Sequence, residues 1–474
     1  MAANLMEEKS DRVQKNNVTD KNGIVPRSTV TKTLVQYSAP LPEATVIFLE
    51  GIAEDYGKVK NYVYQRYSGI KSVNKLTPVY TILNEMRSCG LRNQLGLPSV
   101  YYELAVADAV ADIKGNWGRL KNKISDLIRE NKNLSPEDRL YLRTVLKIGS
   151  VFSAILKSEP SEMPDNAKGL DIDTKRLNNL LRRLVRRHLT VPATENVNTF
   201  RVNPNGYKYQ DGGIYLVSRI PRKRVFIPLK DNRVFDRQIL ITMQGNTALL
   251  YVPIETKVKH HEDYQGTVYM HIGNRDMLTL SNGNIYGQDL EARVYPETLR
   301  LEAKNHERGA VLRNYKIHIA AGDTVKAGKI ERNNLGKKKY ESIKTRERAK
   351  TQDYINTELN RMLKKEKPAR IIIPKPVTKN KTKIYSKTAN LKLKRSFNGY
   401  IRKRLAFKCQ INSIELIEIN SKGTGSICSE CGGEGKCYKG EFTCKSCGLN
   451  TSIGLNSARN IEKKYISLNH QNGE

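Results

Sequence analysis

The sequence has no long hydrophobic run, and no stretch approaches the roughly 18 to 20 apolar residues that a membrane-spanning helix needs. Its start, MAANLMEEKSDRVQKN, contains no apolar segment of the kind found in secretion signals. We therefore expect a cytoplasmic protein without a membrane partner. Hydrophobic residues make up 38% of the chain and charged residues 27%, which is a globular composition rather than a disordered one.

Acidic residues are also in deficit. The 474 residues include 82 Lys and Arg but only 48 Asp and Glu, which gives a formal net charge of +34. Self-repulsion of this size favours a polyanionic partner, and nucleic acid is the leading candidate because phosphate contacts release counterions. A generic basic protein, such as one associated with ribosomes, is the alternative. The length exceeds one compact core, so we expect two to four domains.

Cysteine is scarce, and five of the seven cysteines lie between Cys428 and Cys447. Cys428-Ser-Glu-Cys431 and Cys444-Lys-Ser-Cys447 are two CxxC pairs, each followed by a glycine where the backbone must turn. This spacing predicts a zinc ribbon, because two such turns supply four thiolates to a tetrahedron. A closed site of this kind stabilises structure and does not catalyse. Cys437 lies between the pairs and is not expected to be a ligand.

The first half of the chain predicts strand, helix and strand in turn. Residues 1–27 are polar and predict a mobile tail, and Thr29–Tyr37 predicts a strand. Helical periodicity runs from about Ala44 to Ser158, and short strands with a period of two from Val191 to about Val258 suggest a small β-barrel. Tyrosines among Lys and Arg in the helical region either stack on bases or, as we favour for any one of them, belong to the core. They are Tyr56, Tyr62, Tyr64, Tyr67 and Tyr80.

Two segments are unusually basic. Asp173–His188 predicts an amphipathic helix that tracks phosphates, through Arg182, Arg183, Arg186 and Arg187. No Asp or Glu occurs between Lys367 and Ile414, and such a stretch is either disordered or docked on an anion; we favour docking on nucleic acid. The predicted contacts there are Lys379, Lys381, Lys383, Lys392, Lys394, Arg395, Arg402, Lys403 and Arg404.

The last segments occur in a familiar order. SIELIEINSKGTGSICSECG, the second CxxC pair and GLNSARNIEKKY follow one another, with YMHIGNRDMLTLSNG (269–283) and ARIIIPKPV (369–377) upstream. This order resembles the C-terminal half of the TnpB nucleases and of their relatives, the compact type V CRISPR effectors. That family has a TS-x-x-C-x-x-CG ribbon followed by a D-x-NAA-x-NI helix start. The matching residues after the second CxxC pair are Gly448, Asn456, Ala458, Asn460 and Ile461.

The resemblance implies a multidomain α+β fold. A helical recognition domain would be inserted into a β-barrel (wedge) domain, followed by a split RuvC domain, an RNase H-like α/β fold, with an inserted zinc ribbon. The expected boundaries are a tail at 1–27, first wedge strand at 28–43, helical domain at 44–172, basic helix and wedge barrel at 173–262, RuvC-like domain at 263–420, nucleic-acid-binding ribbon at 421–449 and a RuvC-like C-terminal helix at 450–474.

The departures from the family concern catalysis. A RuvC nuclease needs three carboxylates around two Mg²⁺ ions. The corresponding positions hold His271, Pro374 and Gly454, none of which supplies an anionic oxygen, and a proline also loses a strand hydrogen bond. We therefore predict a nuclease-dead protein with structural zinc and no catalytic Mg²⁺. The alternative is a nuclease rebuilt from shifted carboxylates, such as Asp276, Glu418 or Glu462, although a one-residue shift in a strand reverses the side-chain face.

The resemblance then implies RNA-guided, sequence-specific binding of double-stranded DNA without cleavage. Such binding would regulate transcription, either by blocking RNA polymerase or by recruiting a sigma factor or transposition proteins. It would take place at the nucleoid of a bacterial cytoplasm, and a homodimer is compatible with the family. The alternatives are an active RNA-guided endonuclease and a structural RNA-binding protein that uses no guide.

Overall fold

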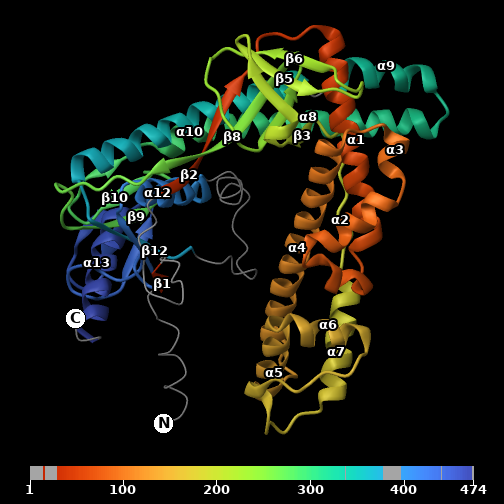
Figure 1. Ribbon diagram of the computed structural model, residues 1–474. Helices are drawn as coiled ribbons and strands as arrows, with labels where there is room; N and C mark the ends of the chain where they lie inside the picture. The colour runs from red at the N-terminus through yellow and green to blue at the C-terminus, as the bar shows by residue number, and fades with distance from the viewer. Residues whose placement is uncertain (1–13, 16–28, 337, 377–396, 439, 472–474) are drawn as a thin grey trace. The chain divides into compact units, whose positions relative to one another are not determined.

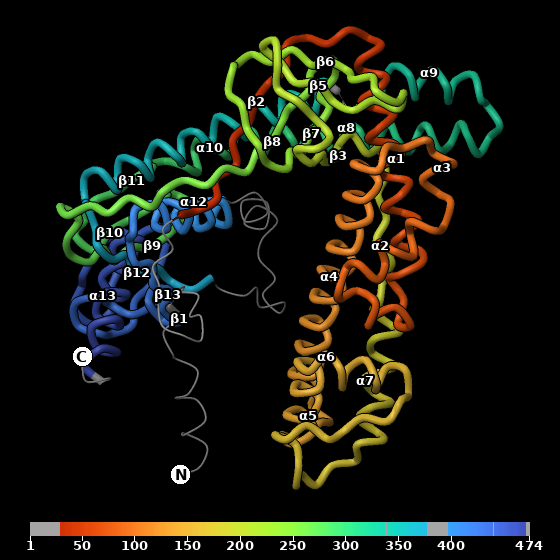
Figure 2. The backbone as a smooth tube through the Cα atoms, in the orientation of Figure 1, coloured from red at the N-terminus to blue at the C-terminus, as the bar shows by residue number. Residues whose placement is uncertain are grey.

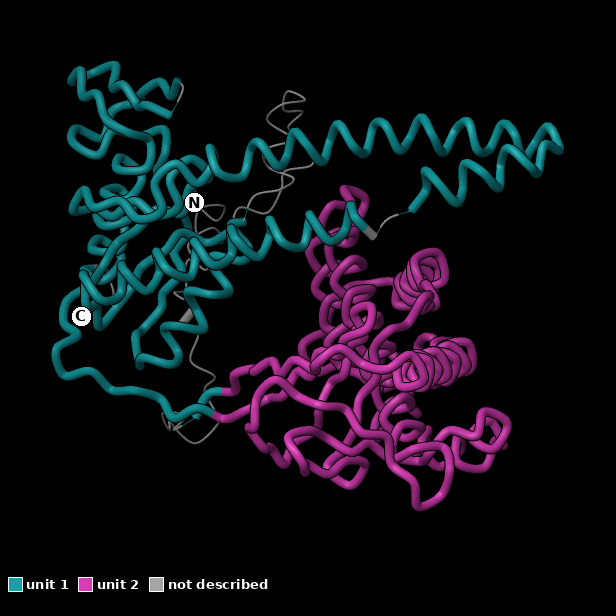
Figure 3. The backbone as a smooth tube through the Cα atoms, turned by 90° about the horizontal axis from the view of Figure 1, so that it is seen from above, with its two compact units in different colours: residues 1–30, 256–474 teal, residues 31–255 magenta. Residues whose placement is uncertain are grey.

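A computed structural model of the chain describes residues 14–15, 29–336, 338–376, 397–438 and 440–471. The chain divides into two compact units, one of residues 31–255 and the other of residues 1–30 and 256–474 (Figure 3). Both helices and strands occur in each unit, in agreement with the predicted α+β content. No helix in the described ranges has the length and apolarity that crossing a bilayer requires.

The unit of residues 31–255 contains a helical part between two groups of strands. Strand β2 (Thr29–Tyr37) has the predicted bounds, and the chain then becomes helical (Figure 1). The helices are α1 (Glu43–Tyr67), η2 (Ile70–Leu76), α2 (Val79–Ser88), α3 (Leu91–Leu95), α4 (Ser99–Glu130), α5 (Pro136–Lys147), α6 (Gly149–Lys157), η3 (Asp165–Ala167) and α7 (Thr174–His188). Helix α1 packs along α4 and contributes most of its tyrosines to the core.

The tyrosines of α1 illustrate this core. Tyr56, Tyr64 and Tyr67 are almost fully buried. Each hydroxyl donates to an acidic side chain; that of Tyr56, for example, lies 2.7 Å from a carboxylate oxygen of Asp108. These three residues therefore belong to the core and are not free to stack on bases, whereas Tyr80 is 70% exposed.

Two small sheets complete this unit. The strands are β3 (Thr199–Val202), β4 (Tyr207–Gln210), β5 (Gly213–Val217), β6 (Arg224–Pro228), β7 (Ile239–Gln244) and β8 (Thr247–Lys257), with η4 (Pro204–Gly206) before β4. One sheet has the order β2-β8-β7-β3 and the other β4-β5-β6. Strand β2 thus pairs with β8 although the whole helical part separates them in sequence. A bridge between Ser38 and Leu229 links the two sheets.

The other unit is built on a six-stranded sheet (Figure 2). Its strands are β1 (Gln14–Lys15), β9 (Thr267–Ile272), β10 (Leu278–Leu280), β11 (Ile285–Tyr286), β12 (Arg370–Pro374) and β13 (Glu415–Ile419), in the order β1-β13-β12-β9-β10-β11. Strands β9, β10 and β11 are antiparallel neighbours, and β12 is parallel to both β9 and β13. This order agrees with the predicted RuvC-like fold.

Two strands of this sheet differ from what the sequence predicts for the N-terminal tail and for Pro374. Gln14 and Lys15, within the predicted tail, pair with β13, and the rest of that tail lies outside the described residues. Pro374 was expected to disturb strand bonding, but it is the last residue of β12 and stands in register with Ile419. The next amide, that of Lys375, donates to the Ile419 carbonyl oxygen at 2.7 Å. A proline at the strand end therefore leaves the ladder intact.

Helices cover both faces of this sheet. The helices of this unit are α8 (Leu290–Ala320), α9 (Thr324–Asn334), α10 (Lys338–Glu366), α12 (Asn398–Ile411) and α13 (Ile453–Gln471). Helix α9 packs against α8. Ile371 and Ile373 of β12 pack with residues of α10 and α12, whereas Ile372 packs with Ile461 of α13. Because strand side chains alternate, α10 and α12 lie on one face and α13 on the other.

Candidate functional site

Four cysteine thiols gather in a ribbon formed with β14 (Gly435–Tyr438), β15 (Glu441–Cys444) and β16 (Asn450–Ser452). The Sγ atoms of Cys428, Cys431, Cys444 and Cys447 all lie within 4.8 Å of one another. Zn–S bonds of about 2.3 Å in a tetrahedron separate the sulfurs by about 3.8 Å. The Cys428–Cys447 and Cys431–Cys444 sulfurs are 3.6 and 3.5 Å apart, so the thiols fit a zinc ion. Cys437 stands outside the cluster.

The backbone of each CxxC turn supports the sulfurs. Gly432 and Gly448 have φ values of 76° and 74°, the left-handed conformation that favours glycine. The amides of Cys447 and Ser446 lie 3.5 and 3.3 Å from the sulfur of Cys444. These N–H groups stabilise the thiolate and lower the pKa of Cys444 to about 6.

Two asparagines of the predicted helix-start motif fasten this ribbon to α13. The side chain of Asn456, which is fully buried, accepts from the amide of Ser429 at 2.8 Å and donates to the Ile427 carbonyl oxygen at 2.8 Å. Asn460 donates to the same carbonyl oxygen at 2.7 Å. Both side chains therefore hold the first CxxC turn against the helix.

The three positions that carry catalytic carboxylates in the resembled family lie at one edge of the sheet. His271 is near the carboxyl end of β9, and Pro374 ends the parallel strand β12. The register that pairs Ile372 with Tyr269 places Pro374 beside His271 two residues further on, on the face covered by α13. Gly454 enters from the first turn of α13.

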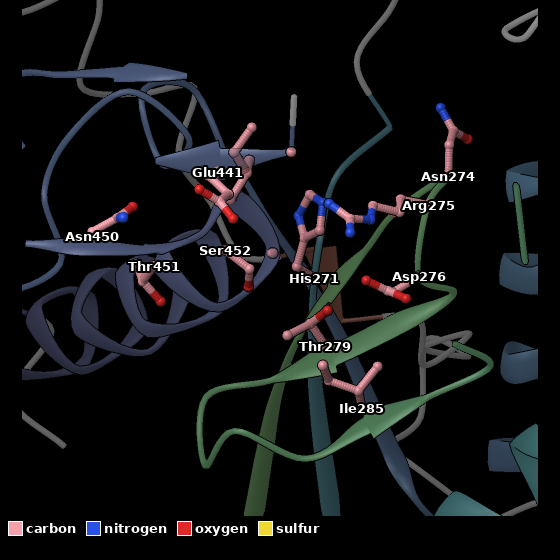
Figure 4. Close-up of a pocket in the computed structure, with 14 residues that line it drawn as sticks. His271, Asn274, Arg275, Asp276, Thr279, Ile285, Glu441, Asn450, Thr451 and Ser452 are labelled. Atoms are coloured by element: carbon pink, nitrogen blue, oxygen red, sulfur yellow. The ribbon is translucent and has the colours of Figure 1, made fainter. Parts of the chain in front are cut away.

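A cavity of about 490 Å³ opens at this edge (Figure 4). Its lining includes His271 and Gly454 together with two carboxylates, Asp276 from the turn after β9 and Glu441 from β15. Asp276 accepts a hydrogen bond from the amide of Asp289 at 3.1 Å. Within the described part of the chain, the cysteine cluster is the only group of three or more His, Cys, Asp or Glu side chains close enough to hold a metal. Sequence reasoning missed Glu441, because only the fold brings the ribbon to the sheet.

Arg402, from α12, lies at the same edge. Its Nη1 donates to the Pro374 carbonyl oxygen at 2.6 Å and lies 3.5 Å from a Glu418 carboxylate oxygen. Only 18% of the side chain is exposed, which makes a phosphate contact a poor description of this residue. Burial, and secondarily the charge of Arg402, lowers the pKa of His271 to about 4, so the imidazole is neutral at pH 7.

The predicted phosphate-contacting arginines of α7 include one half-buried side chain and three exposed ones. Helix α7 buries its leucine face in the helical part of its unit. Its N-cap is Asp173, the first residue of the predicted helical segment. Arg182 is half-buried and donates to Ser158 Oγ at 2.5 Å. Of the four predicted arginines, Arg183, Arg186 and Arg187 remain exposed.

The remaining residues that were predicted to contact nucleic acid come after β12 in the sequence. Lys403 is exposed, whereas Arg404 is half-buried and donates to Asn356 Oδ1 at 2.7 Å. Charge in the sequence did not indicate which side of α12 faces the protein. Outside the described residues lie Lys379, Lys381, Lys383, Lys392, Lys394 and Arg395.

Comparisons with known proteins give one family match. Residues 399–461, which contain β13 and the ribbon, match the family described as Cas12f1-like, TNB domain. The comparison with curated proteins found no match. Among solved structures, the chain is similar to Cas12f1 in its complex with sgRNA and target DNA, with 13% identity and a TM-score of 0.35 over 92% of this chain and 99% of that one. It is also similar to the mini-RNA-guided endonuclease Cas_phi3, with 11% identity and a TM-score of 0.42 over 92% of each chain.

Proposed function

We propose that this protein binds double-stranded DNA under the direction of a guide RNA and does not cut it. The observation that carries the proposal is the sheet edge where His271, Pro374 and Gly454 stand together. An imidazole, a pyrrolidine ring and a hydrogen atom offer no anionic oxygen, and Mg²⁺ selects oxygen ligands. These residues do not fit the two-metal site of a RuvC nuclease.

Binding to polynucleotide is supported by other features. The net charge of +34 suits a polyanion, and the Cas12f1-like TNB match covers the segment that includes the zinc ribbon. Exposed arginines on α7 add sequence-independent contacts to phosphates. A complex that stays on intact DNA would regulate transcription by blocking RNA polymerase or by recruiting a partner such as a sigma factor or transposition proteins.

A second candidate function has one observation in its favour. Asp276 and Glu441 place two carboxylates in the cavity, so a rebuilt nuclease would use them. They come from different elements, and among the described residues no third acidic or histidine side chain joins them within metal-binding reach. We favour the non-cutting function for this reason.

The test starts from the protein isolated from its native cells. Its RNA is sequenced, and the complex is incubated with a plasmid that matches the guide, with and without Mg²⁺. We expect bound, opened and uncut DNA in both conditions. Mg²⁺-dependent nicking would establish the rebuilt nuclease, and RNA binding without duplex opening on any matched plasmid would establish the structural RNA-binding protein.

A further inference from the structure

The turn between β5 and β6 presents an apolar tip among cations. The last paired residues of this antiparallel hairpin are Val217 and Arg224, so residues 218–223, SRIPRK, form the tip. Ile220 is 57% exposed. Pro221 and the three cations that follow it are exposed as well. Neither the sequence patterns nor the family match assigned a role to this tip.

Hydrogen bonds hold the tip in one conformation. Ser218 Oγ donates to the Ile220 carbonyl oxygen at 3.0 Å and accepts from the Ile220 amide at 3.1 Å. The amide of Lys223 donates to the same carbonyl oxygen at 3.1 Å. Arg222 has a φ of 63°, an unfavourable value for a residue with a side chain, which these bonds maintain. The tip is therefore shaped before any partner arrives.

A partly buried ion pair anchors the tip to the helical part of the same unit. The guanidinium of Arg219 lies 2.6 Å from the carboxylate of Asp55, which is only 11% exposed, and it also donates to two backbone carbonyl oxygens at 2.7 and 3.1 Å. Arg222 and Lys223 are different, because their side chains make no ion pair or hydrogen bond with other described residues. One cation thus positions the tip, and two stay available to an anion.

We propose that this tip wedges Ile220 and Pro221 into the target DNA duplex and unstacks a base step, while Arg222 and Lys223 contact the flanking phosphates. The inference rests on the proposed function and deepens it, since a guide can pair with its target only after the duplex opens. Aliphatic and proline wedges beside cations, carried on two-stranded ribbons, are a known way to kink DNA from its minor groove.

The chemistry of the tip favours DNA over other partners. Charged residues are depleted at the core of protein–protein interfaces, whereas the two apolar residues of this tip, Ile220 and Pro221, are flanked on both sides by cations. Double-stranded RNA is recognised mostly by shape and by contacts to its hydroxyls and phosphates, which need no wedge. A rigid tip also loses little conformational entropy on insertion, so more of its contact energy is available for unstacking.

The test compares Ile220→Ser with Val234→Ser. Val234 is 69% exposed in the same unit but outside the tip, so each variant replaces one exposed aliphatic side chain. The complex with guide RNA is titrated with a matched closed duplex and with the same duplex carrying a bubble at the target, labelled with 2-aminopurine. We expect Ile220→Ser to weaken binding to the closed duplex at least about tenfold and to change binding to the bubbled duplex by less than about twofold. The fluorescence of 2-aminopurine rises when the base unstacks, and we expect the wild-type complex to cause this rise on the closed duplex and Ile220→Ser to abolish it. Val234→Ser should behave as wild type.

The outcomes separate this inference from the proposed function. Equal weakening on closed and bubbled duplexes, no weakening on either, or loss of guide-RNA affinity would each overturn the wedge. If the wild-type complex fails to bind the bubbled target, the proposed function itself is wrong and the inference falls with it.

The phosphate contacts have a separate measurement. Replacing Arg222 and Lys223 with Ala should lower the slope of log affinity against log salt by about 1.8, because each phosphate contact contributes about 0.9. The control replaces Lys132 and Arg143 with Ala, which removes the same two charge types from exposed positions in the helical part. Equal slopes for the two double variants would show that only net charge matters and would overturn these contacts.

Discussion

Gly454→Ala tests whether the position that carries a carboxylate in the resembled family has room for a side chain in this chain. A Cβ added at Gly454 would lie 2.6 Å from Oγ1 and 3.1 Å from Cβ of Thr279 in β10. Thr279 is buried, so it has little room to move. Overpacking of this kind costs about 1 to 3 kcal/mol. The change from Gly to Ala in a helix contributes at most about 1 kcal/mol in the opposite direction. The steric cost should therefore win, and we expect net destabilisation of about 1 to 2 kcal/mol.

The same contact predicts a rescue. Thr279→Ala removes the Oγ1 that meets the new Cβ and leaves only the contact with Cβ at 3.1 Å, so Gly454→Ala should cost much less in that background. A double-mutant cycle measured by denaturant unfolding should give a coupling energy of about 1 to 2 kcal/mol. Gly328→Ala in α9 is the control, since nothing lies within 4 Å of a Cβ there, and it should stabilise the protein slightly.

A stable Gly454→Ala protein in the wild-type background would refute this reasoning. It would mean that the edge has room for a side chain, so that an aspartate at this position would be sterically tolerated. If the prediction holds, a carboxylate at position 454 also requires a smaller residue at position 279 in β10. Introducing carboxylates at positions 271, 374 and 454 alone would therefore not produce a metal site.

Three further predictions concern zinc, pH and salt. Cys437→Ser should keep one zinc per chain, whereas removal of zinc by a chelator should unfold the ribbon, as measured by metal content and proteolysis, because structural zinc supplies about 10 to 16 kcal/mol of binding energy. Because the pKa of His271 is lowered in the folded state, the unfolded state takes up a proton first as the pH falls. The free energy of unfolding should therefore drop by up to about 3 kcal/mol between about pH 6.5 and pH 4. His271→Asn should remove this pH dependence in unfolding titrations. Replacing Arg183, Arg186 and Arg187 with Ala should lower the salt slope of DNA binding by about 2.7.

Each of these has a contrary result. Loss of zinc in the Cys437 variant would show that the Cys437 sulfur takes part in binding the metal. An unchanged acid slope in His271→Asn would assign that slope to other groups. An unchanged salt slope in the arginine variant would remove α7 from the nucleic-acid interface.

The sequence predicted local features well. The bounds of β2 follow from an apolar pattern, and the zinc ligands follow from a spacing that a single turn imposes. Strands β3 and β4 were not predicted individually, because a run of only four residues gives a weak signal without the strands that it pairs with.

Features that depend on tertiary packing could not be predicted. Arg402 sits in a charge-rich tract that suggested an exposed surface, and only the packing of α12 on the sheet turns it inward. The contact between Gly454 and Thr279 joins elements that are far apart in sequence. The exposed tip at Ile220 gave no periodic signal, since its shape comes from hydrogen bonds within a turn.

The pairing of β2 with β8 sets an order of events during synthesis. Strand β2 leaves the ribosome first among the strands of its sheet, and its partner follows only after the entire helical part has been translated. Helical segments make mostly local contacts and fold quickly, whereas closing a long loop is slow. The helices should therefore be compact while β2 still has an open edge, and truncated chains that stop before β8 should expose that edge to aggregation.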